Sequence, residues 1–143
     1  MPLHQNLILL PVLAQMLLTL VILGLLPLAR SRSMRERRQQ MQTMALAGKA
    51  DWNEQAQKVS NSFASQFELP TLFYAISAFA LITRTVDGWM LGLATVFVIA
   101  RIVHAIIHIG PNIVVWRFAA FAVCLAALLT MWVRLAWSVS ASF

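Results

Sequence analysis

Five ionisable residues stand out inside segments that are mostly apolar: Glu68, Arg101, His104, His108 and Arg117. A charged side chain within a membrane is costly unless it faces protein, water or a partner. Only one residue of this set is acidic, whereas two are arginines and two are histidines. If the five converge near one membrane face, they predict a wet, mainly cationic pocket that binds an anionic ligand.

The spacing of these residues and of their polar neighbours follows helical periodicity. On a helix, residues three, four and seven positions apart share one face. Two sets have this spacing: Asn61, Ser65 and Glu68 in one segment, and Arg101, His104 and His108 in the next. We expect the two faces to turn toward each other or toward a neighbouring subunit, with Glu68 paired to an arginine. For any one residue, a network that only fixes helix packing is the alternative.

Two other chemistries have less support in the sequence. His104 and His108 with Glu68 would supply three metal ligands, but two histidines one turn apart are more often hydrogen-bonded, so no metal is expected. A proton-coupled transporter would use Glu68 as its carrier, yet neighbouring arginines favour the charged carboxylate. The sequence contains no glycine-rich phosphate loop, nucleophile elbow or Ser/His/Asp arrangement.

By composition, the segments that carry these residues span a membrane. Of the 143 residues, 60% are hydrophobic and 11% are charged, whereas a soluble domain has about 25% charged residues. A spanning helix needs about 20 mostly apolar residues. Four segments meet this need: residues 7–29, 62–83, 89–109 and 113–138. The first is too long for a signal peptide and ends in arginines, so it is expected to be retained. The sequence predicts one all-α domain over residues 1–143, an integral membrane four-helix bundle.

The charge distribution predicts the orientation of the bundle. The formal net charge is +6, and the basic residues gather between the first two spans. Because cytoplasmic loops carry an excess of Lys and Arg, we expect residues 30–60 to be cytoplasmic and both termini to lie on the opposite side. Residues 33–47 contain no Pro or Gly and are expected to prolong the first helix or to form a surface helix. The chain has no room for a folded DNA-reading domain, which excludes nucleic acid as a partner. Its single cysteine, Cys124, cannot form an internal disulfide.

Three motifs combine along most of the chain: Phe67-Glu68-Leu69-Pro70-Thr71-Leu72-Phe73-Tyr74, then Arg101-Ile102-Val103-His104, then Arg117-Phe118. With the four spans and the long basic loop, they resemble a bacterial-type member of the MAPEG family (membrane-associated proteins in eicosanoid and glutathione metabolism). The resemblance implies a homotrimer in the bacterial inner membrane that binds glutathione between neighbouring subunits, near the cytoplasmic face. It also implies that Arg117, at the start of the fourth helix, stabilises the glutathione thiolate.

The same resemblance implies roles for the remaining polar residues. Glu68 matches the family glutamate that contacts the tripeptide, and the run from Arg101 to Arg117 is similar to the prostaglandin E synthase branch, with His108 at a tyrosine position. Animal enzymes have an Arg-x-x-x-Asn-x-x-Glu pattern entering the second helix. Here Asn61 and Ser65 occupy its Arg and Asn positions, and Lys58 is a candidate substitute one turn earlier.

Two functions therefore follow from the sequence and the resemblance. The first is an enzyme similar to glutathione transferases and peroxidases, with thiolate attack on a lipophilic electrophile from the bilayer or reduction of a peroxide. In it, Arg117 is catalytic, and Glu68, Arg101, His104, His108, Ser65 and Asn61 bind glutathione. The alternative is a noncatalytic membrane protein of the same fold that binds lipid or a protein partner.

Overall fold

The structure is a computed structural model that describes residues 3–36 and 52–141, and every regular element in these residues is a helix. The elements are α1 (Leu3–Asn6), α2 (Leu9–Glu36), α4 (Glu54–Ser65), α5 (Leu69–Ile82), α6 (Gly88–Ile109) and α7 (Val114–Ser140). By length and composition, α2, the α4–α5 segment, α6 and α7 are each able to cross a membrane. The prediction of an all-α protein with four spanning segments is confirmed.

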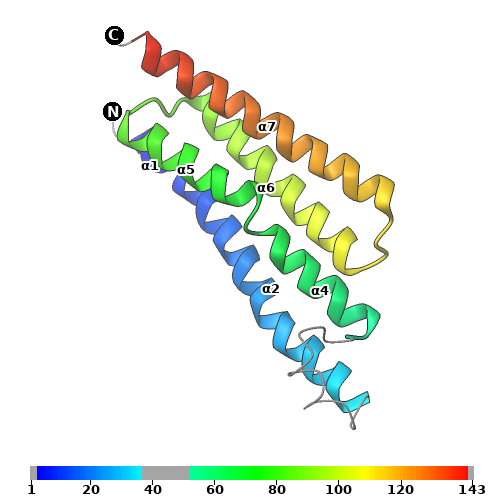
Figure 1. Ribbon diagram of the computed structural model, residues 1–143. Coiled ribbons are helices and arrows are strands. Elements are labelled where there is room, and N and C mark those ends of the chain that lie inside the picture. Colours follow the sequence, from blue (N-terminus) through cyan, green and yellow to red (C-terminus); the bar gives the residue numbers. More distant parts are fainter. Residues whose placement is uncertain (1–2, 37–51, 142–143) are drawn as a thin grey trace.

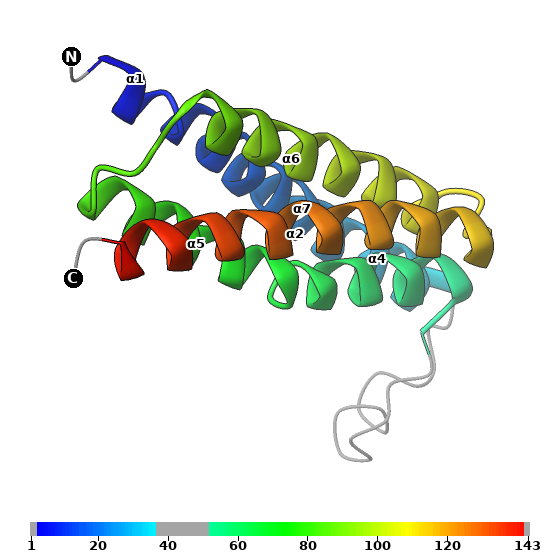
Figure 2. The same ribbon diagram turned by 90° about the horizontal axis from the view of Figure 1, so that it is seen from above.

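The helices lie side by side along one direction (Figures 1 and 2). The N- and C-termini lie at one end of the bundle, and the α6–α7 turn lies at the other end with the end of α2 and the start of α4. The most extensive packing joins α6 to α7, while α2 contacts α4, α5 and α6. We call the end that holds the α6–α7 turn the turn end.

Helix α2 continues seven residues beyond the predicted end of the first span, from Arg30 to Glu36. This agrees with the expectation that the basic segment prolongs the first helix. The rest of that expected helix, residues 37–47, lies outside the described residues. The extension matters because it places three arginines on a helix that projects from the turn end (Figure 1).

The core and the outer surface of the bundle are both apolar. Phe73 of α5 stacks on Phe97 of α6 with ring centroids 4.4 Å apart, and neither ring is exposed. Large apolar side chains such as Leu17, Val115 and Trp137 are exposed on the outside of the chain. A soluble monomer rarely exposes so much apolar surface, so this surface faces lipid or other subunits.

The second span is broken where one continuous helix was expected. Helix α4 ends at Ser65 and α5 begins at Leu69, with Glu68 at φ −86° and ψ −102° between them. Pro70 explains the break, because proline lacks the N–H of an interior helical residue and its ring clashes with the carbonyl four residues earlier. The prediction that Asn61, Ser65 and Glu68 share one helical face is therefore wrong, since the register ends with α4.

At the opposite end, Asp87 fixes the start of α6. Its Oδ1 accepts a hydrogen bond of 2.8 Å from the backbone N–H of Met90, a standard N-cap. Its Oδ2 forms an ion pair with the guanidinium of Arg134 on α7. Arg134 stands inside the last span but was not among the predicted site residues. Its partner shows that it ties α7 to the helix start of α6 and is not part of the predicted pocket.

Candidate functional site

Arg101 lies in the middle of the bundle and is completely buried. Its Nη2 donates to the backbone carbonyl of Ser65 at 3.1 Å and to the Ser65 hydroxyl at 3.2 Å. Ser65 is the last residue of α4, and the carbonyl end of a helix carries partial negative charge. The guanidinium therefore caps the broken end of α4. Its Nε and Nη1 are buried without a hydrogen-bond partner among the described residues.

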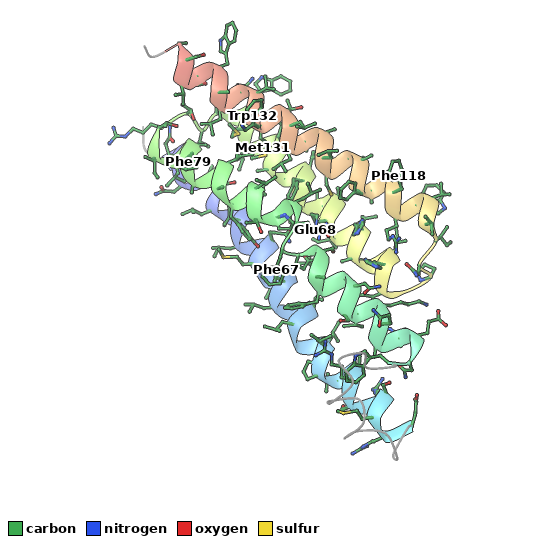
Figure 3. The ribbon with its side chains drawn as sticks, in the orientation of Figure 1. Phe67, Glu68, Phe79, Phe118, Met131 and Trp132 are labelled. Carbon is green, nitrogen blue, oxygen red and sulfur yellow. The ribbon has the colours of Figure 1, made fainter. Side chains whose placement is uncertain are left out.

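Within the part of the chain that the structure describes, Glu68 does not pair with an arginine. Its pairing with an arginine of a neighbouring subunit stays a prediction. Its side chain is exposed on the single chain, at the break between α4 and α5 (Figure 3). The physical reason for the difference is the helix break, which takes Glu68 off the face that carries Ser65.

Two buried glutamines that were not among the predicted site residues extend the polar core to the first helix. Gln15 of α2 donates from Nε2 to Oε1 of Gln66 at 3.0 Å, and Gln66 donates to the carbonyl of Ser62 at 3.2 Å. Oε1 of Gln15 and the Ser62 hydroxyl are buried without a partner among the described residues. For Gln15 the available signal was its place inside an otherwise apolar run, because a polar residue in a span faces the bundle interior.

A second polar group forms toward the turn end, where α6 meets α7. His104 and His108 are buried on α6 with Arg101, as their spacing predicted, and their rings meet edge to face at 5.6 Å. Nδ1 of His104 lies 3.1 Å from the backbone carbonyl of Arg117. Nδ1 of His108 is buried and has no partner in the described residues. The contact between His104 and the Arg117 carbonyl fixes the first turn of α7 against α6.

The α6–α7 turn orients the side chain of Arg117, which is half-buried. Asn112 adopts a left-handed conformation with φ 53°, which asparagine tolerates better than most residues. Its Oδ1 accepts a 2.8 Å hydrogen bond from Nη1 of Arg117. Arg101 lies on the same buried face of α6 as His104, and Arg117 contacts His104 through its carbonyl, so two cationic side chains lie close to this group.

An open pocket of about 180 Å³ lies beside this group. Its lining residues are His104, Val114, Arg117, Phe118 and Phe121. Figure 3 shows Phe118 near the start of α7 and Glu68 further along the bundle at the helix break. The pocket thus combines a guanidinium and an imidazole with aromatic surface, but it is smaller than the roughly 300–1,000 Å³ of most ligand sites.

The predicted cluster is therefore divided. Ser65 and Arg101 form one buried contact, while His104, His108 and Arg117 form the group at the turn end. Asn61 is exposed and accepts a 2.8 Å hydrogen bond from Gln57 on its own helix. Lys58, the candidate substitute for a missing arginine, forms a 2.6 Å ion pair with Glu54 one turn earlier.

Among residues 3–36 and 52–141, no group of three His, Cys, Asp or Glu side chains is placed to hold a metal ion. Cys124 is fully buried, with its sulfur 3.9 Å from the carbonyl of Phe97. A buried thiol in apolar surroundings is chemically inert.

Comparison with protein-family models gives one decisive match, to the MAPEG family over residues 8–137. The chain belongs to the MAPEG family. No match was found among curated proteins or among solved structures. Membership connects this MAPEG protein with a membrane fold generally related to glutathione-dependent transferase and peroxidase chemistry. With its four candidate spans, the MAPEG protein is an integral multi-pass membrane protein.

Proposed function

We propose that this MAPEG protein activates a small thiol, glutathione in the first instance, as a thiolate beside Arg117 and directs it at a lipophilic electrophile. One observation carries the proposal. Arg117 is held by Asn112 at 2.8 Å on the wall of a pocket that also contains His104 and two phenylalanines. The arrangement places a fixed cation next to apolar surface, which suits a thiolate and a lipophilic partner.

The chemistry follows from the properties of the groups. A free thiol has a pKa near 8.5, so little thiolate exists at neutral pH. A guanidinium stabilises the anion and keeps its own proton. The thiol proton leaves to water, and the thiolate sulfur forms a bond to an electrophilic carbon, whose leaving group departs with the bonding electron pair. Phe118 and Phe121 supply apolar contact for an electrophile that arrives from the bilayer.

The polar groups next to this pocket still have hydrogen-bonding capacity, although the bundle buries them in the single chain. His108 has a buried unpaired Nδ1, and two nitrogens of Arg101 have no partner in the described residues. We therefore keep Glu68, Arg101, His104, His108, Ser65 and Asn61 as proposed binding residues. These residues do not supply every cation that the glutathione carboxylates need, because Lys58 is paired with Glu54 and Asn61 carries no charge. The binding assay therefore includes other small anionic thiols.

The proposal is tested with purified protein in detergent. Titration calorimetry should show saturable binding of glutathione, and difference absorbance should show a thiolate signal at pH 7. A thioether analogue without an ionisable thiol is the control, and it should bind without the absorbance change. If neither glutathione nor another small anionic thiol binds, the noncatalytic alternative replaces the proposal.

We further propose that a homotrimer completes the site. The pocket of one chain is small and open, and the apolar outer surface offers area for contact with other copies. Light scattering in detergent, corrected for bound detergent, should give the mass of three chains, each 16.0 kDa. A monomeric mass together with stoichiometric thiol binding would show that one chain makes the site alone.

We also propose that the protein lies in a bacterial inner membrane with its turn end in the cytoplasm. The support is the group of arginines at the end of α2 and the preference of basic segments for the cytoplasmic side. Cysteines introduced at Pro111 and at Thr83 mark the two ends. An impermeant thiol reagent added to intact cells should label Thr83→Cys alone, and labelling of Pro111→Cys alone would reverse the orientation.

A further inference from the structure

A second pocket, of about 320 Å³, shares no lining residue with the pocket beside Arg117, which we call the thiol pocket. It is formed by α2, the start of α4 and the last residue of α6. Its lining includes apolar residues (Leu25, Leu28, Val59 and Ile109) and polar residues (Arg32, Glu36, Asn53 and Gln55). We call it the α2–α4 pocket.

The wall that α2 contributes changes polarity along the helix. Leu25, Leu28, Arg32 and Glu36 are spaced by three, four and four residues, so they follow one face of the helix. This stretch spans roughly 16 Å at 1.5 Å per residue. A phospholipid has the same order of polarity, from acyl chain through glycerol to headgroup. The order is also the one expected where a span leaves the hydrocarbon region.

The polar part of the pocket is a built structure. Asn53 joins the end of α2 to the start of α4 through hydrogen bonds to both helices. Its backbone N–H donates to the Ser33 hydroxyl at 2.8 Å, its Nδ2 donates to Glu36 at 2.8 Å, and its Oδ1 accepts from the N–H of Ala56 at 2.9 Å. These bonds keep the two helices at a fixed separation and hold the Glu36 carboxylate against Asn53.

Arg32 is the cation in this pocket that remains available for a ligand. Arg30 is engaged, because its guanidinium lies 5.1 Å from the Trp52 ring and its Nη2 donates to Ser60 at 3.4 Å. Arg32 has no hydrogen bond or ion pair to any described residue. Three arginines, counting Arg35, stand against the single carboxylate of Glu36 on this last part of α2, so the local charge favours an anionic headgroup.

We propose that the α2–α4 pocket binds one anionic phospholipid, with its phosphate on Arg32 and an acyl chain along Leu25 and Leu28. The site is separate from the thiol pocket beside Arg117, and it does not depend on the thiol chemistry. A zwitterionic lipid fits the shape but leaves the positive charge of α2 without a counterpart. A soluble phosphate fits the arginine but leaves the apolar wall empty.

The test is native mass spectrometry of the full chain released from detergent with added lipid. The wild-type protein should retain phosphatidylglycerol at least about tenfold more strongly than phosphatidylcholine of the same chains, the difference expected from a charge-assisted contact. Glycerol phosphate at the same concentration should not bind. Equal retention of both lipids, or equal binding of glycerol phosphate, would overturn the proposal.

Two variants make the test specific to the pocket. Arg32→Gln should abolish the preference for phosphatidylglycerol, whereas Arg35→Gln removes the same charge from the same exposed stretch but does not line the pocket. Both residues are exposed, so thermal unfolding should change little in either variant. If the two variants lower lipid retention equally, the attraction is a diffuse property of the basic surface and the proposed site does not exist.

Discussion

Arg117→Ala is expected to abolish the thiolate absorbance of the protein–glutathione mixture at pH 7 and to lower turnover by about a hundredfold. The reason is that a positioned donor to a developing anion contributes roughly 10²–10³ in rate. The guanidinium of Arg117 is the positioned cation of the pocket, held by Asn112. Difference absorbance against pH checks the prediction: the bound thiol should titrate below about 8.5 in the wild type and return toward 8.5 in the variant.

Two further substitutions separate this role from a general effect of charge. Arg117→Lys keeps the charge but loses the planar fork of donors, so it should restore part of the signal. Arg134→Gln removes a charge from the same helix at the far end, where Arg134 pairs with Asp87, and should leave the thiol titration unchanged. An Arg117→Ala protein that keeps the wild-type titration and turnover would remove Arg117 from the mechanism.

Arg101→Ala is expected to have the largest effect on stability. The side chain is fully buried and donates two hydrogen bonds to Ser65. Truncation leaves a cavity between α4 and α6 and frees the carbonyl end of α4, at a cost of about 2–4 kcal/mol. Thermal unfolding in detergent should show this as a clear drop in the midpoint.

Arg101→Met is the informative companion variant. It keeps much of the volume and removes a buried cation, a replacement that is often neutral or stabilising. We expect it to unfold close to the wild-type midpoint. If Arg101 only caps α4, the methionine variant should still bind glutathione, whereas loss of binding in a stably folded variant would assign Arg101 to the ligand. A methionine variant as unstable as the alanine variant would show that the contacts to Ser65 are essential for stability.

The fold was predictable because the bilayer restricts what a chain can form. In lipid, each backbone polar group must be satisfied internally, so an apolar run of about 20 residues becomes a helix. The shared face of Arg101, His104 and His108 was predictable for a related reason. It depends on the periodicity inside one unbroken helix, and α6 runs without interruption from Gly88 to Ile109.

Three other features of the structure correspond to single residues in the sequence. Pro70 indicates a break in the second span, and that break separates Glu68 from Ser65. Gln15 and Arg134 are single polar residues in apolar runs. An unpaired polar side chain in a membrane is costly, so both residues need partners inside the bundle, as Arg101 does. Their partners are Gln66 and Asp87.

The sequence by itself determined the four spans, the basic end of the first helix and the polar face of α6, since each depends on residues close together in the chain. Only the tertiary structure decided which partner each polar side chain takes. Arg101 contacts the end of α4 and not Glu68, and Arg117 is oriented by Asn112. The physical reason is that these contacts depend on the rotation of one helix against another and on one backbone turn. Hydropathy and periodicity describe each helix separately. They carry no information about how two helices are rotated against each other or about the conformation of one turn.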